Sequence, residues 1–182
     1  MHVNLIRRTV LLCCLAIISP VIALRAYPSG HVVLAALAAP ADQERALVLY
    51  ANGVQIYECR AVPGESGKYE WAFKAPEADL SDEEGNKVGR HYAGPTWELT
   101  DGGKVVGKIK AKADAPDGKG IPWLLLEAIE NSGPGVLGKA RSIQRIDTMG
   151  GQAPAEPADA SKAGQERRVK YLAAYVFYIA KP

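Results

Sequence analysis

After about residue 44 the chain consists of short apolar runs of strand length, separated by turns rich in glycine and proline. Residues 69–74 alternate strictly, with Tyr69, Trp71 and Phe73 on one face, which is the period of a half-buried strand. Residues 169–179 are apolar on both faces, as expected of a central strand. Similar runs predict further strands at residues 45–50, 54–60, 104–112, 121–129 and 141–148. About eight such strands predict an all-β single domain, an antiparallel β-sandwich or barrel with long loops.

Two segments predict how the strands connect. Asn52-Gly53 lies between two β-rich runs and predicts a tight hairpin, because both residues tolerate positive φ. Residues 151–164 are rich in Ala, Pro and Gly and predict a long loop before the last strand.

The first residues have the pattern of an export signal. An apolar run over residues 9–18 follows Arg7 and Arg8 and gives way to compact residues that end at Ala23. This pattern predicts a signal peptide over residues 1–23, with the mature protein periplasmic or extracellular. The apolar run is shorter than the about 20 residues of a membrane span, so we expect no stable span after cleavage.

The rest of the chain divides into two parts. We expect a lead-in segment over residues 24–44, which could hold a short strand or helix, and the β-domain over residues 45–182. Hydrophobic residues make up 48% and charged residues 23%, which excludes a disordered chain. The whole chain has a net charge of +2, and removal of the signal peptide takes away its two arginines and no acidic residue. No basic surplus then remains, so we expect no nucleic-acid partner.

Motifs for metals and cofactors are sparse. Beyond the signal peptide, Cys59 is the one cysteine, so no internal disulfide is expected; a buried thiol, an intermolecular bridge or a reactive thiol remain open. His31 and His91 do not share a metal-ligand spacing with it, and we expect no metal. The glycines of residues 133–138 match G-x-G-x-x-G, but too little chain follows for a crossover helix. We therefore interpret that segment as a loop and expect no cofactor.

The richest cluster of candidate functional residues surrounds the Gly94-Pro95 bend. If that dipeptide is the centre of a tight hairpin, His91 faces Glu98 and Tyr92 faces Trp97. The first pair could act as a general base with an orienting carboxylate. The second pair could form a platform for a sugar or another flat apolar ligand. In the plainer interpretation, Trp97 is a core residue, His91 is hydrogen-bonded and Glu98 is solvated.

Two classes of function follow. The first is an exported, noncatalytic β-domain that binds a small molecule, a glycan or an envelope component. Its expected ligand-binding residues are the aromatic side chains Tyr92, Trp97, Trp71 and Trp123. The second is an exported hydrolase or isomerase that uses His91 and Glu98 as its acid–base pair. The shortage of catalytic constellations favours the first, and the sequence does not define the oligomeric state.

Several ordered blocks of the chain resemble one known family. They lie at residues 53–59, 91–98, 121–126, 143–145 and 148–151. Together they resemble the exported family known as domain of unknown function 3455, from about residue 47 to residue 178. The resemblance implies export and no settled activity. Relatives often carry a second cysteine near the position of Ala158; if it pairs with the equivalent of Cys59, that tether is absent here, and we expect residues 151–164 to be freer to move.

Overall fold

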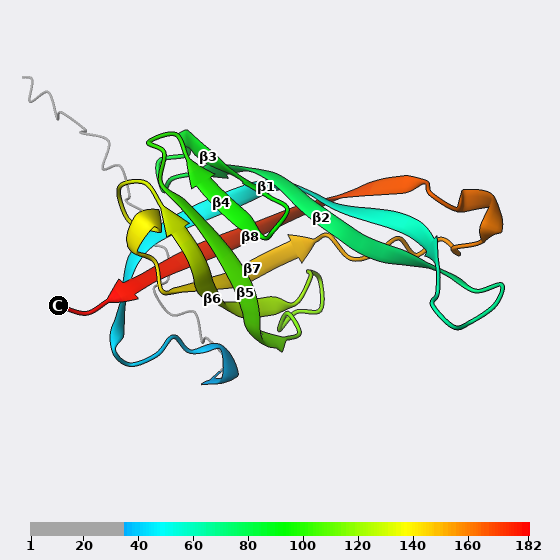
Figure 1. Ribbon diagram of the computed structural model, residues 1–182, viewed down its shortest axis with the longest axis horizontal. Helices are drawn as coiled ribbons and strands as arrows, with labels where there is room; N and C mark the ends of the chain where they lie inside the picture. Colours follow the sequence, from blue (N-terminus) through cyan, green and yellow to red (C-terminus); the bar gives the residue numbers. More distant parts are fainter. Residues whose placement is uncertain (1–34) are drawn as a thin grey trace, which may run out of the picture. The chain divides into compact units, whose positions relative to one another are not determined.

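The predicted strands form one antiparallel sheet that closes on itself, with the strands joined in chain order (Figure 1). The computed structural model describes residues 35–182, so the predicted signal peptide over residues 1–23 lies outside the described residues. The strands are β1 (Gln43–Ala61), β2 (Tyr69–Ser81), β3 (Lys87–Tyr92), β4 (Thr96–Leu99), β5 (Lys104–Ala113), β6 (Trp123–Ser132), β7 (Ser142–Gly150) and β8 (Glu166–Ala180). In the described range three short 3-10 helices accompany them: η1 (Ala35–Leu37), η2 (Leu137–Lys139) and η3 (Ala160–Lys162). The all-β prediction is confirmed, and of its two forms the barrel is correct. None of the helical segments in the described range has the length and hydrophobicity that crossing a bilayer requires.

One predicted hairpin is wrong. Residues on both sides of Asn52-Gly53 belong to a single strand, β1, which pairs with β2 on one side and β8 on the other through this position. A Cβ on Gly53 would lie 2.1 Å from the carbonyl oxygen of Glu77 and 2.5 Å from the Cβ of Ala78. Glycine is therefore needed here for close approach of two backbones rather than for a turn. The actual β1–β2 turn follows at residues 62–68.

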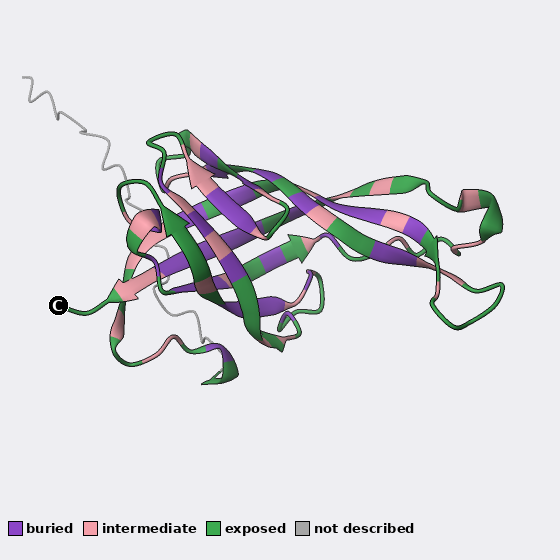
Figure 2. Cartoon of the chain, viewed as in Figure 1, coloured by how far each residue is buried: buried purple, intermediate pink, exposed green. Residues whose placement is uncertain are grey.

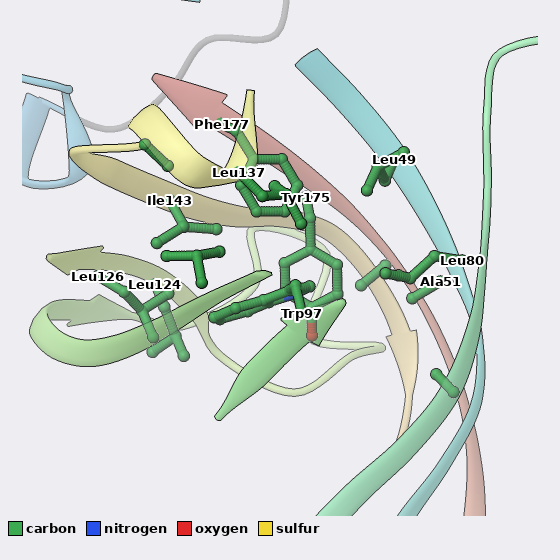
Figure 3. Packing of buried hydrophobic residues seen from close by; sticks show 14 of the residues in the cluster. Leu49, Ala51, Leu80, Trp97, Leu124, Leu126, Leu137, Ile143, Tyr175 and Phe177 are labelled. Carbon is green, nitrogen blue, oxygen red and sulfur yellow. The ribbon is translucent and has the colours of Figure 1, made fainter. Parts of the chain in front are cut away.

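The last strand is central, as its two apolar faces predicted. β8 pairs with β1 and with β7, and residues 173–177 are all buried (Figure 2). Its inward side chains Tyr175 and Phe177 meet Trp97 of β4 inside the barrel (Figure 3). Its outward residues Ala174 and Val176 lie in a second apolar cluster with Leu37 of η1. Both faces are apolar because one lines the barrel and the other lies beneath η1.

The loop that connects β6 to β7 packs into the barrel core. It contains the Gly133–Gly138 motif, which ends within η2, and β7 begins at Ser142 with no crossover helix between them. Gly133 and Gly135 adopt positive φ values of 74° and 70°, which glycine reaches without strain. Leu137 is fully buried in the inner cluster. The motif therefore serves as a loop, as predicted.

Strands β1, β2 and β8 continue beyond the shorter strands as a three-stranded arm (Figure 1). The long loop predicted over residues 151–164 lies between β7, which ends at Gly150, and β8, which begins at Glu166 in this arm. Cys59 is buried and free, and its backbone N–H donates to the Gln165 carbonyl at 2.9 Å. Trp71 donates from Nε1 to the Glu156 carbonyl at 3.0 Å, and Ala158 packs on the cluster that contains Cys59 and Trp71. Hydrogen bonds and apolar contacts thus hold the loop to the arm.

Candidate functional site

An opening in the barrel wall arises because β3 and β4 are short, with six and four residues. β3 pairs with β2 over residues 78–81 of β2, and β4 pairs with β5 over residues 104–106 of β5. Within residues 35–182, the rest of β2 and β5 therefore has no strand neighbour on the facing side. The turn at residues 93–95 lies at the edge of this gap, since it connects the two short strands.

A cavity of about 250 Å³ lies at the gap, and its walls are mainly apolar. Trp97, Leu124 and Leu126 line it from the barrel core. At the surface, Phe73 of β2 is 51% exposed and Ile109 of β5 is 56% exposed, and both line the same cavity. Large apolar side chains are thus left in water at the rim of an apolar hollow, a combination typical of ligand-binding sites.

His91 points into the barrel and lines the cavity. Its Nδ1 lies 2.8 Å from the carbonyl oxygen of Thr96, so Nδ1–H is the donor and Nε2 remains an acceptor in the neutral ring. The ring stacks on Trp97, with centroids 4.5 Å apart and planes 12° apart. Burial lowers the pKa of His91 to about 3; the bond to Thr96 opposes this in part, and the Arg145 charge adds to it. His91 is therefore neutral at pH 7 and only weakly basic.

The predicted His91–Glu98 pair is not assembled. The hairpin is centred on Gly94 with a three-residue turn, so His91 pairs with Trp97 and Glu98 pairs with Arg90. The pairing of β4 with β3 is thus shifted by one residue from the predicted register, and such a shift moves each side chain to the other face of the sheet. Glu98 consequently lies on the outer face, where it accepts from Arg90 Nη2 at 2.8 Å and from the Tyr92 hydroxyl at 3.0 Å. The predicted register is wrong, and the Tyr92–Trp97 pair fails for the same reason.

The four aromatic residues predicted to bind ligand occupy four different surroundings. Trp97 lines the cavity. Tyr92 lies on the outer face beside Glu98. Trp123 packs in the outer cluster with Leu37, and Trp71 packs in the arm. The structure therefore brings none of the other three to Trp97.

Arg145 lines the cavity, whereas the sequence predicted only a strand around it and a block of family resemblance over residues 143–145. Its neighbour Ile143 belongs to the inner cluster and Ile146 to the outer one, so Arg145 extends inward with Ile143 and reaches the cavity. Its Nε and Nη2 donate to the Pro122 carbonyl at 3.1 and 2.8 Å. No ion pair among residues 35–182 includes Arg145. No local signal in the sequence distinguished Arg145, because β7 also contains the polar residues Gln144 and Asp147.

Nε1 of Trp97 is buried and has no hydrogen-bond partner among the described residues. The hydroxyls of Tyr171 and Tyr175 interact with each other, and that of Tyr175 also interacts with Arg145. Burial raises the pKa of both tyrosines, and the Arg145 charge opposes the rise in each case. The charge that acts on these hydroxyls is therefore positive. Within residues 35–182, no group of three His, Cys, Asp or Glu residues could hold a metal ion.

Comparison with known proteins agrees with the resemblance seen in the sequence. The model of the family described as "Protein of unknown function (DUF3455)" matches residues 40–179, which takes in β1 to β7 and nearly all of β8. No curated protein and no solved structure matches the chain significantly. The match covers most of the chain and includes the hairpin, β6 and β7 that line the cavity. The chain therefore belongs to the DUF3455 family.

Proposed function

We propose that this protein is an exported, noncatalytic binding protein whose barrel holds a small apolar molecule in the cavity beneath the β3–β4 turn. The observation that carries the proposal is an apolar cavity whose exposed rim residues, Phe73 and Ile109, are apolar too. Its volume of about 250 Å³ exceeds the roughly 150 Å³ that accommodates benzene in an engineered protein core. A ligand with one ring or a short alkyl chain is the size that fits.

Among the partners expected from the sequence, the cavity favours a small molecule over a glycan. A glycan needs several polar side chains on an open face, whereas the walls here are mainly apolar. A binding role is favoured over acid–base catalysis because His91 and Glu98 are on opposite faces of the barrel wall. Export rests on the predicted signal peptide, and a periplasmic or extracellular location is part of the proposal.

The test uses two neutral apolar probes, 1-octanol and 2-phenylethanol, titrated by calorimetry into protein purified after expression of the full chain. We expect binding of at least one probe with a negative heat-capacity change, which marks burial of apolar surface. Ile109→Trp should block the rim and weaken binding at least about tenfold. Ile129→Trp is the matched control, because Ile129 is 58% exposed on β6 and does not line the cavity.

Two results would count against the proposal. The binding function would be excluded if neither alcohol binds and the corresponding acids, octanoate and phenylacetate, do not bind either. Equal weakening by Ile109→Trp and Ile129→Trp would show that the probes bind elsewhere. The intact mass of the same protein tests export, since a chain that retains residues 1–23 would contradict it.

A further inference from the structure

We infer that the ligand of this cavity is a small apolar carboxylic acid, whose carboxylate is bound by Arg145. The inference rests on the proposed function and names the chemical class of its ligand. It starts from the position of Arg145, which is partly buried, inward-facing and in contact with the cavity. Removing a charge from water is costly unless an opposite charge or hydrogen bonds replace the solvent.

Arg145 has unused binding capacity. A guanidinium group carries five N–H donors, and those of Nε and Nη2 that bond to Pro122 share a single carbonyl oxygen. That carbonyl is neutral, and no ion pair among the described residues gives Arg145 a counter-charge. A carboxylate suits the remaining donors, because its two oxygens match the guanidinium fork.

The charges that line the cavity have one sign. Two lining residues are cationic, Lys74 and Arg145, and none of the described lining residues is acidic. Lys74 is already neutralised, since its Nζ lies 2.7 Å from a Glu166 oxygen and 3.5 Å from a Glu58 oxygen. The charge without a partner is therefore that of Arg145, on the inner side of the cavity.

The neighbouring polar groups strengthen the preference for an acceptor. Trp97 lines the cavity, and its Nε1 has no partner within residues 35–182. Indole N–H is a donor only, and the Nδ1–H of His91 is already used by Thr96. Buried polar groups without partners are rare in folded proteins and call for an explanation. An anionic head group beside Arg145, with its apolar tail between Phe73 and Ile109, would explain both the donors and the apolar rim.

The experiment compares each neutral probe with its matched acid at pH 7.5: 1-octanol with octanoate and 2-phenylethanol with phenylacetate. We expect at least one acid to bind about tenfold or more tightly than its alcohol. Acetate should not bind measurably, because charge without apolar surface is insufficient. The octanoate and phenylacetate arms distinguish an aliphatic from an aromatic acid.

Arg145→Met removes the charge and keeps an unbranched side chain. This variant should lose at least about tenfold in affinity for the acid and keep its affinity for the alcohol. Arg141→Met is the matched control, because Arg141 is exposed just before β7 and does not line the cavity. If Arg145→Met fails to fold, the comparison of acid with alcohol on the unchanged protein still decides.

The outcomes separate the two proposals. Equal affinity for acid and alcohol, or equal losses of both in Arg145→Met, would overturn the inference and leave the proposed binding function intact. Binding of neither member of either pair would overturn both.

Discussion

The stability of this protein should fall below pH 6.5 because of His91. The ring is 2% exposed, and its pKa is lowered to about 3 by burial, with a further contribution from Arg145. In the unfolded chain the pKa returns to its ordinary value of 6.5. Between pH 3 and pH 6.5, His91 binds a proton in the unfolded state but not in the folded state. The free energy of unfolding therefore decreases as the pH falls from 6.5 toward 3.

The magnitude follows from the two pKa values. One pH unit within this window corresponds to about 1.4 kcal/mol, so the loss between pH 7.5 and pH 5 is about 2 kcal/mol. His91→Asn isolates this effect, because the asparagine amide can donate to Thr96 as Nδ1–H does but cannot titrate. The variant should be less stable than the wild type at pH 7.5, since it loses the stacking on Trp97.

The assay is urea denaturation followed by tryptophan fluorescence at pH 7.5, 6.5, 5.5 and 5.0 on both proteins. Carboxylates titrate alike in the two proteins, so their effects cancel in the difference of unfolding free energies. That difference should shrink by about 2 kcal/mol between pH 7.5 and pH 5. A difference that stays constant across this range would refute the reasoning, because it would mean that the folded protein binds the proton as readily as the unfolded chain.

Three further predictions concern the fold. Gly53→Ala should destabilise the protein by about 2 kcal/mol or more in chemical denaturation, because the new Cβ would meet the Glu77 carbonyl. The control Asn52→Ala, at the exposed neighbouring residue, should cost at most about 0.5 kcal/mol. Equal effects of the two substitutions would contradict the continuous strand. Leu37→Ala should lower the free energy of unfolding by about 3 kcal/mol, since Leu37 is fully buried against the outer face of the barrel. A negligible change in thermal or chemical unfolding would mean that η1 does not cover that face. Ala158→Cys should form a disulfide with Cys59 under oxidising conditions, visible as the loss of two hydrogens in the intact mass, and stabilise the protein by about 3 kcal/mol. Absence of the bond would show that residue 158 does not come within disulfide geometry of Cys59.

The sequence alone was sufficient for the class of fold and the family. Period-two alternation at residues 69–74 and the doubly apolar run at 169–179 predicted strands that the structure contains. These signals are local, because the faces of a strand depend only on the positions of its own residues. The loop interpretation of the glycine motif was also local, since it needed only the absence of a helix-length segment after Gly138.

The strand pairing and the site depended on the tertiary structure. Asn52-Gly53 has the composition of a turn, yet pairing with β2 and β8 on both sides holds it in a continuous strand. At the β3–β4 hairpin, one residue of turn length decided whether Glu98 or Trp97 would face His91.

Arg145 shows most clearly that the local sequence does not determine the direction of a side chain. The alternation of β7 could place it on either face, and only closure of the barrel between β1 and β8 makes one of those faces an interior. The sequence by itself determined which segments are strands, because that property resides in neighbouring residues. The tertiary structure decided register, closure and the direction of each side chain, because those depend on contacts between residues far apart in the chain, and the candidate site is made of such contacts.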